Sequence, residues 1–172
     1  VGSIDNQNVH ALQNIDYVII CPEQFVAQAT QLAQAHEEID GVTWAVVTDQ
    51  QAFNEFSSGT PDATAFRWVM KMLYDRANNS SSIQKPRWLL LMGDGTYDNH
   101  KLRSNSGLNT LLTYQAKNST VETKAYATDD YFGFLDNTEG ESDTYGRMDI
   151  GVGRLPVNTV AQAQQVVDKT IR

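Results

Sequence analysis

Cysteine is almost missing from this sequence, since Cys21 is the only one among 172 residues. A single cysteine cannot form a disulfide within the chain, so the residues give no indication of an oxidising compartment. Long apolar stretches are missing as well. The longest runs, such as residues 17–21 and 88–92, are far shorter than the ~20 residues of a membrane-spanning helix. We therefore expect no membrane span in this chain.

Positive charge is also scarce, because 13 basic residues stand against 21 acidic ones and give a formal net charge of −8. Such a chain repels phosphate backbones, so we expect no nucleic-acid partner. Several motifs of enzyme chemistry are missing too, among them H-E-x-x-H, C-x-x-C and the phosphate-binding G-x-x-x-x-G-K-[ST]. Residues 151–153 form only a G-x-G within a strand pattern, which does not support a dinucleotide site.

The length and composition that are present fit one soluble globular domain with its own core, spanning residues 1–172. The chain begins at Val1 instead of methionine. Its last helical pattern reaches Arg172 without a glycine or proline to end it. We therefore expect this sequence to be part of a longer polypeptide.

Short apolar runs alternate with helical patterns along the chain, which predicts the α/β class. We expect a mostly parallel four-stranded sheet with helices on both faces, and a long excursion after the third strand. The predicted strands are residues 15–21, 42–47, 87–92 and 149–157, and the predicted helical segments are 25–41, a short turn at 53–56, 60–77 and 159–172.

Acidic residues gather after the third predicted strand, where the apolar run at 89–92 stops at Gly93 and Asp94. The carboxyl ends of strands in an open α/β sheet are where ligands usually bind. Calcium takes six to eight oxygen ligands, mostly carboxylates and carbonyls, so a calcium site is one interpretation; a solvated acidic loop is the alternative. The carboxylates concerned are Asp94, Asp98, Asp129, Asp130, Asp136, Glu139, Glu141, Asp143 and Asp149.

Cys21 follows the first predicted strand, where a nucleophile could use His36 or His100 as its base. The spacing of these residues does not support that arrangement. A small buried side chain before Pro22 is the simpler interpretation of Cys21. His36 is then a packing residue on a helix, and His100 a solvated loop residue.

Four blocks in order resemble the gingipain-type cysteine peptidases, and within them the C-terminal signal peptidases, or sortases, of the type IX secretion system. The similarity runs nearly from end to end of the chain. The blocks are residues 56–64, 89–99, 128–136 and 149–157.

This resemblance implies a caspase-like catalytic domain made of two α/β subdomains side by side, of which residues 1–172 are similar to the first. The catalytic cysteine and histidine of the family belong to the second, expected after residue 172, so we predict no catalytic residue here and an inactive fragment. The implied partners are that second subdomain, secreted proteins with C-terminal signals as substrates, and type IX secretion components. The implied location is the bacterial cell surface.

The resemblance also implies calcium as a cofactor. Asp94, Asp136 and Asp149 match positions that bind calcium in the family. The chain has an insertion between the last two, so Glu139, Glu141 or Asp143 is expected to supply the remaining ligand.

Two other functions stay open. The chain could be a stand-alone, calcium-stabilised interaction module of a secretion apparatus. It could also be a flavodoxin-like nucleotide or phosphate binder with Asp94 and Asp98 on magnesium, although that idea rests on fold class alone.

Overall fold

A computed structural model describes residues 6–100, 102, 111–116, 121, 126–140 and 146–172. Its central element is a four-stranded sheet in the order β2-β1-β3-β6, in which every neighbouring pair is parallel. The predicted α/β class and parallel sheet are therefore confirmed. The sheet strands are β1 Tyr17–Cys21, β2 Trp44–Thr48, β3 Trp88–Met92 and β6 Gly151–Leu155.

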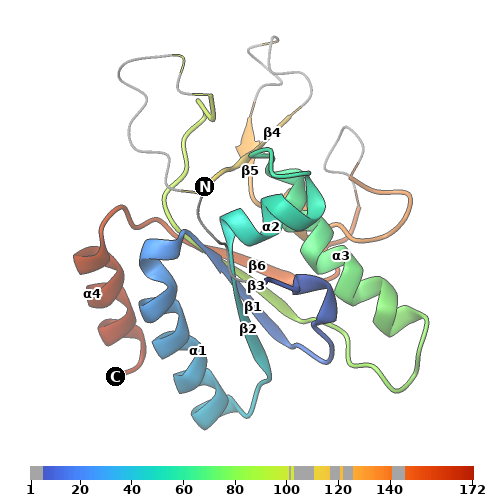
Figure 1. The fold of residues 1–172 in the computed structure, drawn as a ribbon, viewed down its shortest axis with the longest axis horizontal. Coiled ribbons are helices and arrows are strands. Elements are labelled where there is room, and N and C mark those ends of the chain that lie inside the picture. Colours follow the sequence, from blue (N-terminus) through green and yellow to red (C-terminus); the bar gives the residue numbers. More distant parts are fainter. Residues whose placement is uncertain (1–5, 101, 103–110, 117–120, 122–125, 141–145) are drawn as a thin grey trace.

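Helices cover both faces of this sheet (Figure 1). α1 (Val26–Asp40) and α4 (Val160–Thr170) pack on one face, against Ile19 and Met92 among others. α2 (Asp49–Phe56) and α3 (Thr64–Asn78) pack on the other. Because both faces are covered, β1 is buried along its whole length, as its continuous apolar sequence predicts.

Local signals in the sequence explain several helix ends. α1 ends at Gly41, whose φ of 66° lies in the left-handed region that glycine adopts without strain. α2 and α4 begin with capping boxes, Thr48 with Gln51 and Thr159 with Gln162. In each, the threonine side chain and the glutamine side chain satisfy backbone amides at the start of the helix.

Two helical predictions need correction. The segment at 53–56 is the end of a full helix, α2, instead of a short turn. α3 begins at Thr64 and not near Thr60, because residues 57–60 form a separate turn in which the Ser57 hydroxyl donates to Thr60 O at 2.6 Å. Asp62 then accepts the Thr64 amide at 2.8 Å.

The excursion after β3 contains a small antiparallel ribbon that the sequence did not predict, formed by β4 (Tyr114–Gln115) and β5 (Ala127–Thr128). Three short 3₁₀ helices complete the described elements. These are η1 Val9–Ala11, η2 Glu23–Phe25 and η3 Asp130–Gly133. In the part of the chain that the structure describes, we find no helix with the length and apolar character needed to cross a bilayer.

The amino end of the sheet is fastened by Asp16, which is 2% exposed. Its carboxylate accepts hydrogen bonds from Arg87 Nε at 2.8 Å and from the Thr43 amide at 3.1 Å. Burial alone would raise the pKa of Asp16, but the bonds from Arg87 and Thr43 outweigh that effect and hold the pKa below its ordinary value. Asp16 therefore joins the starts of β1, β2 and β3 as an anion.

Candidate metal centre

Three carboxylates meet beside the amino end of β6. Asp136, Glu139 and Asp149 each offer an oxygen, and these oxygens lie within 4.8 Å of one another. Asp136 is exposed, and the other two are partly buried. We call these three residues the acidic centre. A set of oxygen-only, anionic ligands suits a hard cation such as calcium.

A tight turn and the start of β6 bring these residues together. The Glu139 amide donates to Asp136 O at 3.1 Å, which closes the turn. The Leu135 amide donates to Asp149 Oδ2 at 2.9 Å and so ties the turn to the residue that precedes β6. Gly140 follows with a φ of 84°, and a Cβ there would lie 2.4 Å from Arg67 Cζ, so both the conformation and the space require glycine.

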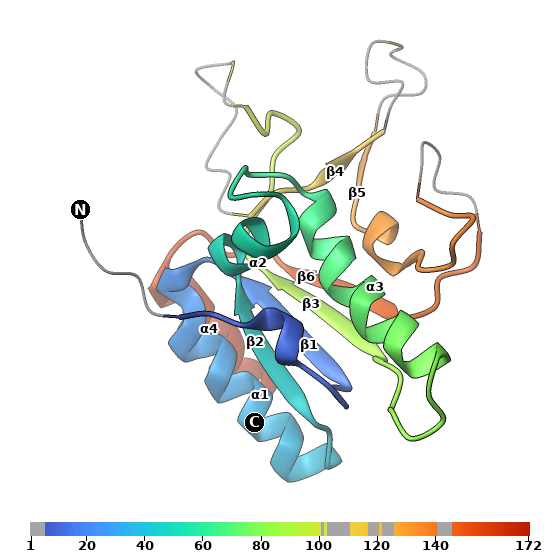
Figure 2. The same cartoon turned by 45° about the vertical axis from the view of Figure 1, so that its right-hand side comes forward.

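Helix α3 lies beside the segment that leads into this turn (Figure 2). It supports the turn with two buried cations. Arg67 Nε donates to Phe134 O at 2.7 Å, and Lys71 Nζ donates to Leu135 O at 3.0 Å. Arg67 Nη2 also reaches Glu139 O at 3.0 Å. Both cations thus bind backbone carbonyl oxygens. Neither forms an ion pair with the carboxylates of the acidic centre.

Tyr74, one turn further along α3, contacts the carboxylates directly. Its hydroxyl oxygen lies 2.9 Å from Asp149 Oδ1 and 3.2 Å from Asp136 Oδ1. Burial, and then the hydrogen bond to Asp149, raise the pKa of Tyr74 to about 12. The phenol therefore stays protonated at neutral pH and donates its one hydrogen to the pair of carboxylates.

The carboxylates of the acidic centre make no direct ion pair among the described residues, and the nearby Lys85 has its Nζ 4.8 Å from the centroid of the Tyr74 ring. Within the described ranges, no lysine, arginine or histidine nitrogen lies within 4 Å of its three carboxylates. Three carboxylates held this close repel one another, and a bound divalent cation would remove that repulsion. The arrangement can therefore hold a cation, and it offers no nucleophile.

The structure does not bring Asp94 to this centre. Asp94 follows β3 and its amide bonds to Val157 O, beyond the carboxyl end of β6, whereas Asp149 precedes β6. At ~3.3 Å per residue the two aspartates stand roughly 25 Å apart along the sheet. Asp94 instead accepts Asn158 Nδ2 at 2.9 Å. Asp94 therefore does not belong to the centre formed by Asp136, Glu139 and Asp149. Glu141 and Asp143 lie outside the described residues.

At the carboxyl edge of the sheet, Arg154 of β6 makes a fork-like pair with Asp129. Its Nε and Nη2 lie 2.7 and 2.8 Å from the two carboxylate oxygens. The same guanidinium donates to Gly93 O at 2.8 Å and to Leu112 O at 3.0 Å. Arg154 therefore fixes the excursion onto the end of β3.

Cys21 is fully buried at the end of β1. Burial, followed by the nearby charges of Asp49 and Glu23, raises the pKa of its thiol to about 12. His36 bonds to Asp40 at 2.7 Å and packs edge-on against Tyr17. The described residues show no hydrogen bond between Cys21 and a histidine, in agreement with its interpretation as a packing residue.

The sequence did not single out Arg67, Lys71 and Tyr74 as parts of a site. The signal was nevertheless present, because these residues repeat at four and three positions on one face of a helix. Glu139 was one of several candidates, and only the fold selects it.

Comparison with known proteins identifies the family and the fold. The family model described as peptidase family C25 matches residues 10–172. The crystal structure of dimeric latent PorU from Porphyromonas gingivalis superposes with a TM-score of 0.87 at 41% identity. The match covers 100% of this chain and 17% of that one, so the chain spans about a sixth of the PorU polypeptide. No curated protein sequence matched. The chain belongs to peptidase family C25, the gingipain family of cysteine peptidases.

Proposed function

We propose that this chain is the non-catalytic part of a bacterial cell-surface cysteine endopeptidase or sortase, which removes C-terminal signals from proteins exported by the type IX secretion system. The observation that carries the proposal is the 41% identity to PorU over the whole chain. The catalytic cysteine and histidine would be supplied by a second α/β subdomain of the same polypeptide. The chain described above would support that subdomain.

Cysteine chemistry explains how such an enzyme could either hydrolyse its substrate or transfer the acyl group to an amine. The thiolate attacks the carbonyl carbon of the scissile bond, the C–N bond breaks, and the leaving amine takes a proton from the histidine. The resulting thioester is resolved by water, which gives proteolysis, or by an amine, which gives transfer. Cys21 is poorly suited to this role because it is fully buried and its pKa is raised.

A cleavage assay tests this assignment. The chain alone should not cleave a fusion protein that carries a type IX C-terminal signal. A longer form that continues past residue 172 should cleave it, and Cys21→Ala in that longer form should keep the activity. Cleavage by the chain alone that Cys21→Ala abolishes would overturn the proposal. An inactive longer form that still binds calcium would favour the alternative, a calcium-stabilised interaction module.

We also propose that the acidic centre binds calcium through Asp136, Glu139 and Asp149. Its oxygen ligands, and the lack of a direct ion pair to them among the described residues, support this. Glu141 and Asp143 follow the turn in the sequence and are candidates for further ligands. Asp94, at the opposite end of the sheet, is not included in this centre. Calcium would tie the turn at 136–139 to the start of β6.

Thermal unfolding in calcium and in chelator tests the site. A ligand that binds only the folded state, at a hundred times its dissociation constant, adds about 2.7 kcal/mol, or about 5–10 °C in melting temperature for a chain of this size. Asp149→Asn should remove that increase. Asp168→Asn, on the distant helix α4, is the matched control and should keep it. A melting temperature that calcium leaves unchanged in the unmodified chain would contradict the proposal.

A further inference from the structure

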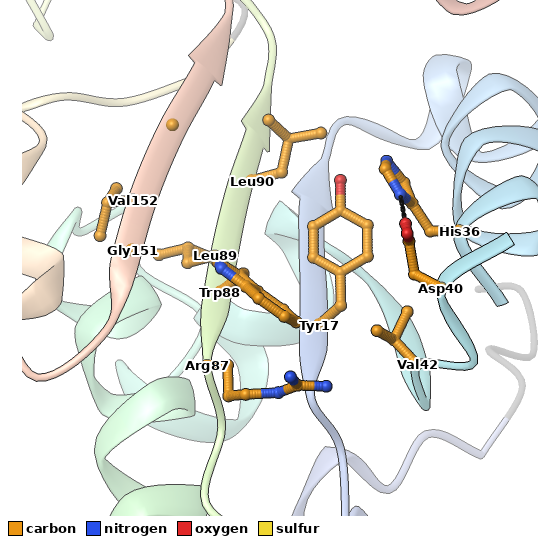
Figure 3. A pocket seen from close by; sticks show the side chains of 11 residues that line it. Tyr17, His36, Asp40, Val42, Arg87, Trp88, Leu89, Leu90, Gly151 and Val152 are labelled. Carbon is orange, nitrogen blue, oxygen red and sulfur yellow. Dashed lines mark hydrogen bonds and ion pairs between the residues drawn. The ribbon is translucent and has the colours of Figure 1, made fainter. Parts of the chain in front are cut away.

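Lys85 stands on the segment that leads into β3, next to the segment that leads into β6. Trp88 of β3 is paired with Gly151 of β6, and the Gly151 amide donates to Arg87 O at 2.9 Å (Figure 3). Counting two residues back along each parallel strand places the residue after Lys85 level with Asp149. The course of the backbone therefore brings Lys85 close to the acidic centre.

The side chain of Lys85 is exposed and lies against the tyrosine of the acidic centre. Its Nζ is 4.8 Å from the centroid of the Tyr74 ring, and the hydroxyl of that ring contacts Asp149 and Asp136 at 2.9 and 3.2 Å. Among the described residues, Lys85 forms no ion pair. An aromatic ring holds its ammonium group only weakly, beside carboxylates that attract it.

The two other cations near the centre are fixed in place. Arg67 and Lys71 are 4% and 6% exposed, and they donate to the carbonyl oxygens of Phe134 and Leu135. Moving either group would leave a buried carbonyl oxygen without its partner. Lys85 is therefore the cation of this region that can respond to a change in the charge of the centre.

The backbone on both sides of Lys85 is held, so that only its side chain is free to move. The Gln84 amide donates to Asn14 Oδ1 at 2.9 Å, and the Arg87 amide donates to Asp16 O at 2.8 Å. The ammonium group is thus tethered near the acidic centre by a flexible four-carbon stem. A short flexible tether gives a group an effective concentration of the order of mM, at which it competes with dissolved ions.

We propose that Lys85 is an internal competitor for the cation of the acidic centre. Its ammonium group compensates the carboxylates while the centre is empty, and a bound calcium ion repels it into the solvent. Lys85 thereby weakens calcium binding and sets the calcium concentration at which the turn at 136–139 becomes fastened to β6. This inference rests on the calcium binding proposed above.

A charge series at position 85 tests the proposal, with calcium affinity measured by titration calorimetry on the chain freed of metal ions. Lys85→Arg keeps the charge and should keep the dissociation constant within about twofold. Lys85→Met keeps an unbranched stem without the charge, and should lower the dissociation constant about three- to tenfold. Lys85→Glu should lower it further. In about 1 M salt these differences should shrink, because the charges are then screened.

Lys169→Met and Lys169→Glu are the matched controls, since Lys169 lies on α4 and these variants change the net charge equally. They should leave the dissociation constant unchanged. Asp149→Asn should abolish the binding, which locates the ion at the acidic centre. Circular dichroism shows that each variant is folded.

Acylation of lysine amines, followed by mass spectrometry, gives a second measurement on the unmodified chain. Calcium should speed acylation at Lys85 and not at Lys169, because a nearby divalent cation disfavours the protonated amine. Equal calcium affinity across the Lys85 series, or equal shifts in the Lys169 series, would overturn this inference and leave calcium binding intact. Failure of the unmodified chain to bind calcium would overturn both.

Discussion

Two groups of acidic residues at opposite ends of the sheet have different partners. At the carboxyl edge, Asp129 is paired with Arg154, and Asp94 accepts an amide from Asn158. At the amino end of β6, the acidic centre has only the Tyr74 hydroxyl and backbone amides as partners for its carboxylates among the described residues. Asp129 is therefore neutralised by a paired cation, whereas the acidic centre gains from an added one.

Removing the cation at the carboxyl edge should have the largest effect. Arg154→Ala leaves Asp129 and the carbonyls of Gly93 and Leu112 without their partner, and the Arg154 side chain is only 12% exposed. We expect a loss of about 3–5 kcal/mol in the free energy of unfolding, measured with urea. Calcium should not change this loss. Arg154→Lys should recover part of it, and a loss below about 1 kcal/mol would contradict the role of Arg154.

Neutralising one carboxylate at each end sharpens the comparison. Glu139→Gln should abolish a calcium-dependent gain of up to about 2.7 kcal/mol, and in chelator it should be neutral or slightly stabilising because it relieves repulsion. Asp129→Asn should instead destabilise equally in calcium and in chelator. Urea unfolding under both conditions measures the four values. Equal behaviour of the two variants would show that the ends do not differ as the geometry indicates.

Asp16 also lies at the amino end of the sheet, but unlike the acidic centre its carboxylate has a cationic partner, Arg87. Since its pKa is lowered on folding, its contribution to stability is present above the unfolded pKa of about 3.9 and is lost as the pH falls through the folded value. Asp16→Asn should cost about 2 kcal/mol at pH 7. Its stability should approach that of the unmodified chain below about pH 4. Parallel curves of stability against pH would contradict this account.

The sequence predicted the strands and most helix ends because those depend on local patterns, such as the apolar run at 17–21 and Gly41 after α1. The start of α3 was misplaced because Thr60 carries the signals of an N-cap, yet its carbonyl is engaged by Ser57. A turn closed between residues three apart in the sequence decided that boundary. The N-cap signals of Thr60 alone do not reveal this turn.

The candidate site was predicted less completely. Asp94 follows β3, whereas Asp149 precedes β6. In a parallel sheet the two aspartates must therefore lie at opposite ends of the strands. That conclusion could have been drawn from the sequence, because the strands were predicted to be parallel. The choice of Glu139 depends on how the turn folds over Arg67, which sequence spacing does not determine.

Tyr74 tests the smallest difference between the two ends. Tyr74→Phe keeps the ring and removes the hydroxyl that holds Asp136 and Asp149 together. In chelator we expect a loss of about 1 kcal/mol in the free energy of unfolding, since one partly buried hydrogen bond is lost. In calcium the loss should shrink, because a cation between the carboxylates replaces the bridge. Tyr17→Phe, whose ring lies on the other face of the sheet, is the control and should respond equally in both conditions. A Tyr74→Phe loss that calcium does not reduce would mean that the hydroxyl positions the turn independently of any cation.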